Sequence, residues 1–68
     1  MNVTLNGESR RLAERASVRA AVTASGATDD ARGLAVAVDG EVVPRGEWDA
    51  TELREGQRVE IVQAVQGG

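Results

Sequence analysis

Two dipeptides, Asn6-Gly7 and Asp39-Gly40, constrain the fold of this chain more than any other feature of its sequence. Both central positions of a type I′ turn need a positive φ, and Asn-Gly and Asp-Gly meet this need at low steric cost. Each dipeptide lies between two short segments that can pair as strands. The sequence therefore predicts two β-hairpins within only 68 residues.

The first hairpin is expected over residues 2–12. Residues 2–6 alternate between polar and apolar side chains, which places Val3 and Leu5 on one face of a half-buried strand. Residues 8–12 are polar apart from Leu12, as expected for an exposed edge strand that is anchored by one apolar side chain.

The second hairpin is expected to join residues 34–38 to residues 41–43. Pro44 follows at once and cannot donate a hydrogen bond to a sheet, so the returning strand should lie at an edge or end there. Residues 45–55 show no clear periodicity, and we expect a turn or a short helix in this segment.

A two-turn helix is predicted for residues 18–25. Ser17 is a favourable N-cap, and Gly26 is typical of the residue that ends a helix. Val18 and Val22 begin a narrow apolar stripe at helical spacing. A helix this short is not stable alone, so the stripe must pack against one face of a sheet.

Residues 58–65 form the last segment that is expected to be regular. Their β-branched, nearly continuous apolar content predicts a central strand that is covered for much of its length. The predicted core consists of Val3, Leu5, Leu12, Val18, Val22, Val36, Val38, Trp48, Leu53, Val59 and Ile61.

The order of these elements predicts an α+β fold with two layers. A ubiquitin-like β-grasp has this order and size, with a mixed sheet of about five strands packed on one short helix. We expect residues 1–64 to form this single domain and residues 65–68 to form a flexible C-terminal Gly-Gly tail.

The residue types that are missing exclude several classes of protein. The chain has no Cys and no His, which removes Cys-type zinc sites, iron–sulfur clusters and the Ser-His-Asp triad. A net charge of −3 disfavours nucleic-acid binding, and no apolar run approaches the ~18 residues of a membrane span. We therefore expect a cytoplasmic protein that holds no metal.

Trp48 and Glu60 are the side chains that could belong to a partner surface. Trp48 is the only aromatic residue, and it could either anchor the core or form a hot spot on a partner. Glu60 belongs to a set of acidic residues in the C-terminal third, which could steer docking onto a basic partner or simply form a solvated face.

The C-terminus offers chemistry that needs no side chain. Residues 65–68 could reach ~13 Å beyond the domain. Gly67 and Gly68 lack a Cβ and can enter a channel too narrow for other residues. The terminal carboxylate is ionised at neutral pH and can attack the α-phosphate of ATP in an activating enzyme. A sulfur nucleophile could then displace AMP and leave a thiocarboxylate.

Three stretches of the sequence resemble one known family. They are Val3–Gly7, Val36–Arg45 together with Trp48, and Leu53–Val62 continuing into Val65–Gly68. These stretches are similar to the sulfur-carrier proteins of thiamine biosynthesis, the ThiS proteins, and they span nearly the whole chain. The sequence departs from the family at Gln57, where an acidic residue often follows the glycine.

The resemblance implies that the protein is a co-substrate and not an enzyme, and that it has no cofactor of its own. Gly68 would be adenylated by an ATP-dependent, E1-like adenylyltransferase. It would then receive sulfur as a thiocarboxylate, with a cysteine desulfurase as the indirect source. Thiazole synthase would accept that sulfur, and Val65, Gln66 and Gly67 would enter the active sites of both partners with Gly68.

Other functions share this fold and this tail. The chain could carry sulfur for molybdopterin or cysteine synthesis, although those carriers tend to be longer. It could also be a ubiquitin-like modifier of lysine side chains, or an interaction module whose tail takes part in no reaction.

Overall fold

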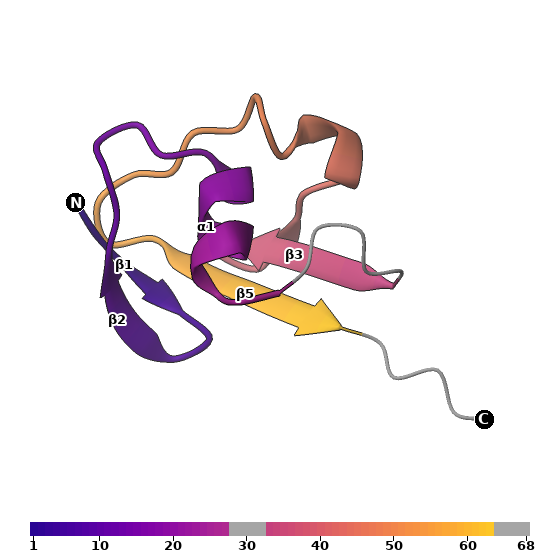
Figure 1. Ribbon diagram of the computed structural model, residues 1–68, viewed down its shortest axis with the longest axis horizontal. Coiled ribbons are helices and arrows are strands. Elements are labelled where there is room, and N and C mark those ends of the chain that lie inside the picture. The colour runs from indigo at the N-terminus through magenta and orange to yellow at the C-terminus, as the bar shows by residue number, and fades with distance from the viewer. Residues whose placement is uncertain (28–32, 64–68) are drawn as a thin grey trace.

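The computed structural model describes residues 1–27 and 33–63. Within these ranges the elements in chain order are β1 (Asn2–Leu5), β2 (Glu8–Arg11), α1 (Val18–Ala24), β3 (Leu34–Val38), β4 (Glu41–Val42), the 3₁₀ helix η1 (Arg45–Glu47) and β5 (Arg58–Gln63). The strands form one sheet in the order β2-β1-β5-β3-β4, and α1 packs against it (Figure 1). The pairing of β1 with β5 is parallel and the other pairings are antiparallel. This mixed α+β arrangement is the predicted β-grasp.

Both predicted turns form at the expected dipeptides. Asn6 and Asp39 have φ of 49° and 50°, and the glycines that follow have φ of 84° and 86°. All four residues of β2 are exposed, as expected for a polar edge strand. The local turn chemistry therefore places both hairpins correctly.

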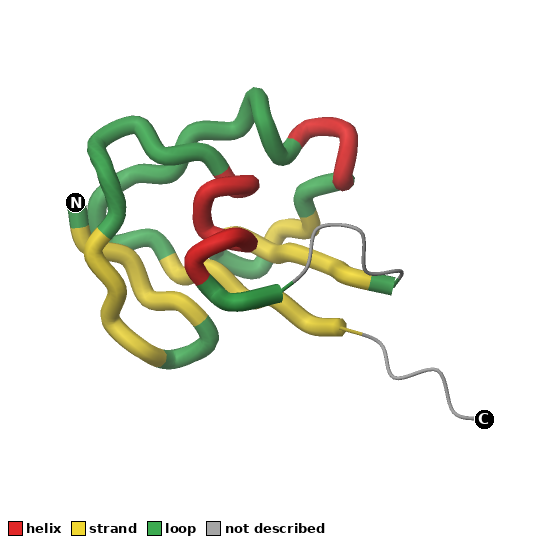
Figure 2. Tube along the Cα trace, in the orientation of Figure 1, coloured by secondary structure: helices red, strands yellow, loops and turns green. Residues whose placement is uncertain are grey.

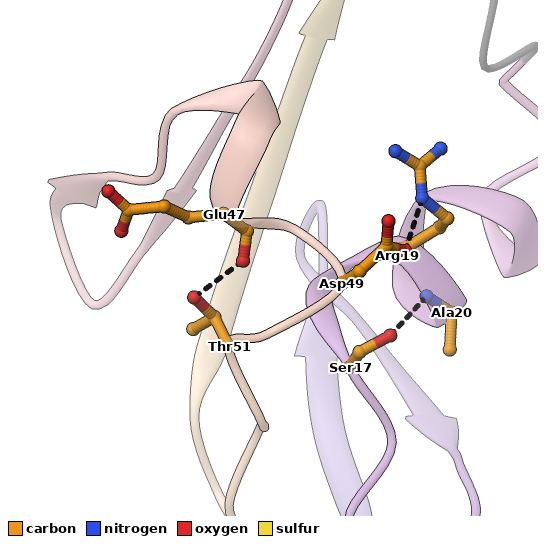
Figure 3. Close-up of polar contacts among 6 residues, drawn as sticks. All are labelled: Ser17, Arg19, Ala20, Glu47, Asp49 and Thr51. Carbon is orange, nitrogen blue, oxygen red and sulfur yellow. Dashed lines mark hydrogen bonds and ion pairs between the residues drawn. The ribbon is translucent and has the colours of Figure 1, made fainter.

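The helix begins and ends where its capping residues predict. The Ser17 hydroxyl oxygen accepts a hydrogen bond from the Ala20 N–H at 3.2 Å (Figure 3). Ser25 is the C-cap, and Gly26 follows with a φ of 85°. The buried side chains of α1 are Val18, Ala21 and Val22, which confirms the predicted stripe.

The core lies between α1 and one face of the sheet. It contains every predicted residue except Leu12, which is half-buried and packs against the core. It also contains two residues outside the predicted set, Met1 and Ala21. Trp48 is the largest side chain in this core, and its indole N–H donates a hydrogen bond to the Val43 carbonyl at 2.9 Å.

The segment after η1 returns across the beginning of α1 (Figure 2). The Val18 N–H donates to the Thr51 carbonyl at 2.9 Å, and the Leu53 N–H donates to the Ala16 carbonyl at 2.8 Å. These bonds hold the segment beside the helix, so its buried side chains Trp48 and Leu53 complete the core.

β5 has the predicted central position in the sheet, but the prediction that it is covered for much of its length was wrong. The strand is central, with β1 on one side and β3 on the other. Its burial alternates, however, and Val62 is 62% exposed. The reason is that α1 covers one face of the sheet, so alternate side chains of β5 point away from the core.

Candidate functional site

The C-terminal end of β5 is the part of the described structure nearest to the predicted tail. Val65, Gln66, Gly67 and Gly68 lie outside the described residues, which end at Gln63. The described part of the candidate site consists of the contacts that hold the last residues of β5 and of the surface around them. In Figure 1 this end of β5 lies on the opposite side of the molecule from the N-terminus.

The two neighbours of β5 support its end unequally. β3 pairs with it over five residues, from Val38 opposite Val59 to Leu34 opposite Gln63. β1 pairs only through Thr4 and Leu5, because the first hairpin then turns away. Past Val59, the main chain of β1 no longer accompanies β5.

The side chain of Asn6 bonds β5 beyond the last residue that pairs with β1. The Asn6 backbone N–H donates to the Val59 carbonyl at 2.9 Å. Beyond that bond, the Asn6 Oδ1 accepts from the Ile61 N–H at 2.7 Å, and the Asn6 Nδ2 donates to the Ile61 carbonyl at 3.2 Å. The side-chain amide therefore replaces the peptide group that β1 would have supplied in a longer strand. The sequence pattern alone predicts Asn6 as the end of the first strand and the beginning of the turn, and it gives no sign of this contact.

The outer face of the sheet, away from α1, carries an exposed apolar surface next to this strand end. A shallow hollow of about 180 Å³ is lined by Ala35, Val36, Ala37, Val42, Glu60 and Val62. Val42 is 72% exposed and Val62 is 62% exposed, and they are the large hydrophobic side chains exposed among the described residues. We call Ala35, Ala37, Val42, Glu60 and Val62 the outer-face patch.

The two predicted partner-surface residues do not lie together. Glu60 belongs to the outer-face patch and is exposed. Trp48 is only 1% exposed, so the hot-spot alternative for this residue is wrong and the core alternative is correct. Its ring packs in the core beneath the guanidinium groups of Arg19 and Arg45, at 5.5 Å and 5.3 Å from the ring centroid.

The other acidic side chains are not gathered around Glu60. Asp49 pairs with the Arg19 Nε at 2.6 Å on the helix side of the molecule (Figure 3). Glu55 accepts a hydrogen bond from the Asn2 N–H at 2.9 Å. Among residues 1–27 and 33–63, no group of three or more acidic side chains is arranged to hold a metal ion.

A second hollow, of about 360 Å³, lies beside the turn between β3 and β4. It is lined by Val38, Asp39, Glu41, Val42, Val43, Glu47, Thr51 and Gln57. The Asp39 carboxylate there accepts from the Arg58 N–H at 3.0 Å and from the Gln57 Nε2 at 3.3 Å. These bonds tie the turn to the beginning of β5, far along the strand from its C-terminal end.

Comparisons with known proteins show which family and which solved structures this chain is similar to. The model of the ThiS family matches residues 3–68. A crystal structure of the thiamine biosynthesis protein ThiS from Geobacter metallireducens is 33% identical, with 100% of both chains covered and a TM-score of 0.79. A solution NMR structure of a thiamine biosynthesis protein from the same organism is 33% identical, with a TM-score of 0.77. This second match covers 100% of the present chain and 88% of the chain in the NMR structure.

A comparison with curated protein sequences found no match to this chain. Within the ranges that the structure describes, no helix is long and apolar enough to cross a membrane.

Proposed function

The chain belongs to the ThiS family, and on this premise we propose that it carries sulfur on the carboxyl group of Gly68 for thiazole formation in thiamine biosynthesis. The observation that carries the proposal is the extent of the family match. It covers residues 3–68 and therefore includes the terminal Gly67-Gly68 as well as the folded domain. The protein acts as a co-substrate that is charged, consumed and charged again.

The proposed chemistry takes place on the main chain. The Gly68 carboxylate attacks the α-phosphate of ATP in an E1-like adenylyltransferase, which forms an acyl-adenylate and releases pyrophosphate. A sulfur nucleophile at the oxidation level of sulfide then displaces AMP and leaves a thiocarboxylate. The sulfur derives indirectly from the persulfide of a cysteine desulfurase, and two equivalents of a thiol reductant release it as sulfide while they are oxidised to a disulfide. Thiazole synthase then accepts the sulfur from the thiocarboxylate.

The length of chain beyond β5 limits where these enzymes can bind. Gly68 is the fifth residue after Gln63, and five fully extended residues span at most ~18 Å. An active site that holds Gly68 must therefore lie close to the end of β5. Residues 65–68 enter that site, and the body of the enzyme contacts the sheet beside it.

We assign this contact to the outer-face patch. The patch includes Val62, which lies one residue before the end of β5, and it supplies the exposed valines of the described residues. An apolar surface on the enzyme would cover Val42 and Val62, and a basic side chain on the enzyme would pair with Glu60 at the rim. The occupant is the adenylyltransferase, because charging needs Gly68 to reach ATP inside that enzyme.

Intact mass spectrometry tests the proposal. The protein is incubated with ATP, an E1-like adenylyltransferase, a desulfurase, cysteine and a thiol reductant, and the C-terminal peptide is examined for replacement of one oxygen by sulfur. A variant that lacks Gly67 and Gly68 should fold normally and remain uncharged. A Gly67→Val variant should be charged slowly, because a β-branched side chain obstructs a narrow channel.

Two outcomes would contradict the proposal. Charging of the variant that lacks Gly67 and Gly68 would show that the terminal residues are not the site. ATP-dependent adducts on lysine side chains of other proteins, with no thiocarboxylate, would favour a ubiquitin-like modifier instead.

A further inference from the structure

The amide group of Asn6 contacts the backbone of Ile61 with both a donor and an acceptor, across 55 positions of sequence. A turn alone does not require this contact. A type I′ turn needs a residue that tolerates positive φ, and Gly or Asp would serve equally well. Only Asn combines that tolerance with a planar amide, which offers the same N–H and C=O pair as a peptide group.

The equivalent residue of the other hairpin makes a different contact. Asp39 has nearly the same φ as Asn6 and precedes a glycine in the same way. Its carboxylate can only accept hydrogen bonds, and it bonds the Arg58 N–H at the beginning of β5. The two turns thus hold opposite ends of one strand, and Asn6 holds the end that leads towards Gly68.

We propose that Asn6 is a positioning residue for the charging of Gly68. Its two bonds hold Ile61 on the β1 side of β5, while β3 holds the other side through Val62 and Gln63. Without the Asn6 amide, the last support on the β1 side is at Val59. The end of β5 is then held by one neighbour, so it opens more often and directs the following residues less consistently.

This inference rests on the proposed function, and it predicts a specific kinetic signature. The outer-face patch is unchanged when Asn6 is replaced, so the KM of the adenylyltransferase for the carrier should change little. The productive placement of Gly68 becomes rarer, so kcat should fall. A residue that merely stabilised the fold would lower the folded fraction and raise the apparent KM instead.

The experiment compares Asn6→Gly with Asp39→Gly. Both variants keep a residue that accepts positive φ, and each removes the side-chain bonds between one turn and β5. Hydrogen exchange of the Ile61 amide should become about five- to tenfold faster in Asn6→Gly, the range expected for a lost hydrogen bond. The kcat for charging should fall by a factor of about three to ten. Asp39→Gly should leave Ile61 exchange and kcat unchanged.

Asn6→Asp provides the conservative variant. It retains an acceptor for the Ile61 N–H and loses the donor to the Ile61 carbonyl, so its kcat should lie between those of the wild type and Asn6→Gly. Equal losses in Asn6→Gly and Asp39→Gly would overturn the positioning role and leave only a stabilising one. Wild-type kcat in Asn6→Gly would also overturn it.

The wild-type chain serves as the reference for the proposed function itself. If the wild type becomes charged and Asn6→Gly becomes charged at the same rate, only the positioning role fails. If the wild type forms no thiocarboxylate, the proposed function fails and the positioning role fails with it.

Discussion

Val59 and Val62 lie three residues apart in β5, yet Val59 is fully buried and Val62 is 62% exposed. The first packs against the helix layer, and the second belongs to the outer-face patch. The same contrast separates Val36 of β3, which is 1% exposed, from Val42 of β4, which is 72% exposed. The inner valines hold the fold together. The outer ones are exposed to water, and we expect them to contribute little to stability.

The contrast arises because α1, the one α-helix among residues 1–27 and 33–63, is short. α1 is seven residues long and covers one face of a five-stranded sheet. Side chains alternate between the faces of a strand, so half of each strand necessarily points away from α1. An apolar residue on the uncovered face loses contact with water only when another molecule binds there.

The largest effect on stability is expected in the core between α1 and the sheet. Trp48→Ala should destabilise the fold by about 3–5 kcal/mol, because it leaves a large cavity and removes the bond to the Val43 carbonyl. A domain of this size has a total stability of only ~3–10 kcal/mol. Circular dichroism should show a largely unfolded protein or a greatly lowered urea midpoint. A urea midpoint equal to that of the wild type would contradict the role of Trp48 in stabilising the core.

Val59→Ala and Val62→Ala test the contrast within one strand. Val59→Ala should cost about 2 kcal/mol, because methyl groups leave a buried site. Val62→Ala should change the free energy of unfolding by no more than ~0.5 kcal/mol. Urea denaturation of the two proteins measures the difference directly, and equal costs would contradict the assignment of the two faces.

Combined replacement of Val42 and Val62 by alanine tests the outer face for function. The double variant should unfold like the wild type, while the KM of the adenylyltransferase for it should rise about tenfold, as expected when contact residues at an interface are truncated. Initial rates of pyrophosphate release at varied carrier concentration give the KM. The outer-face patch would be excluded as the docking surface by an unchanged KM.

The smallest effect is expected for a polar contact on the helix side. The pair formed by Arg19 and Asp49 is short, but the Asp49 side chain is 74% exposed and water screens the interaction. Asp49→Asn should therefore cost less than ~0.5 kcal/mol. It should also leave charging unchanged, since Asp49 lies away from the outer-face patch. A marked loss of charging in this variant would place the partner on the helix side.

Gln57, where the resemblance to ThiS proteins leads us to expect an acidic residue, makes two hydrogen bonds that favour an amide. The Gln57 Oε1 accepts from the Arg54 N–H at 2.7 Å, and its Nε2 donates to the Asp39 carboxylate at 3.3 Å. An acidic residue here would keep the first bond and would repel Asp39. The amide at position 57 is therefore matched to the carboxylate that begins the second turn.

Local chemistry in the sequence was sufficient to predict both turns, the limits of α1 and almost all of the core. Positive φ at Asn6 and Asp39, and the caps at Ser17 and Gly26, depend on residues within a few positions of each other. The resemblance to ThiS proteins predicted the family, which the comparisons confirm, and led to the proposed role of the C-terminal residues, which no periodicity could supply. The residues of that predicted site lie beyond Gln63, the last residue that the structure describes.

Only the tertiary structure decided which valines of β4 and β5 are exposed and what the Asn6 amide contacts. A run of β-branched residues looks the same whether one or two faces of its strand are covered, because coverage depends on the number of layers and not on the run itself. The contact between Asn6 and Ile61 joins residues 55 positions apart, and it exists because the parallel pairing of β1 with β5 ends where the first hairpin turns. Such a contact depends on strand order and register, which are set by the packing of the whole chain.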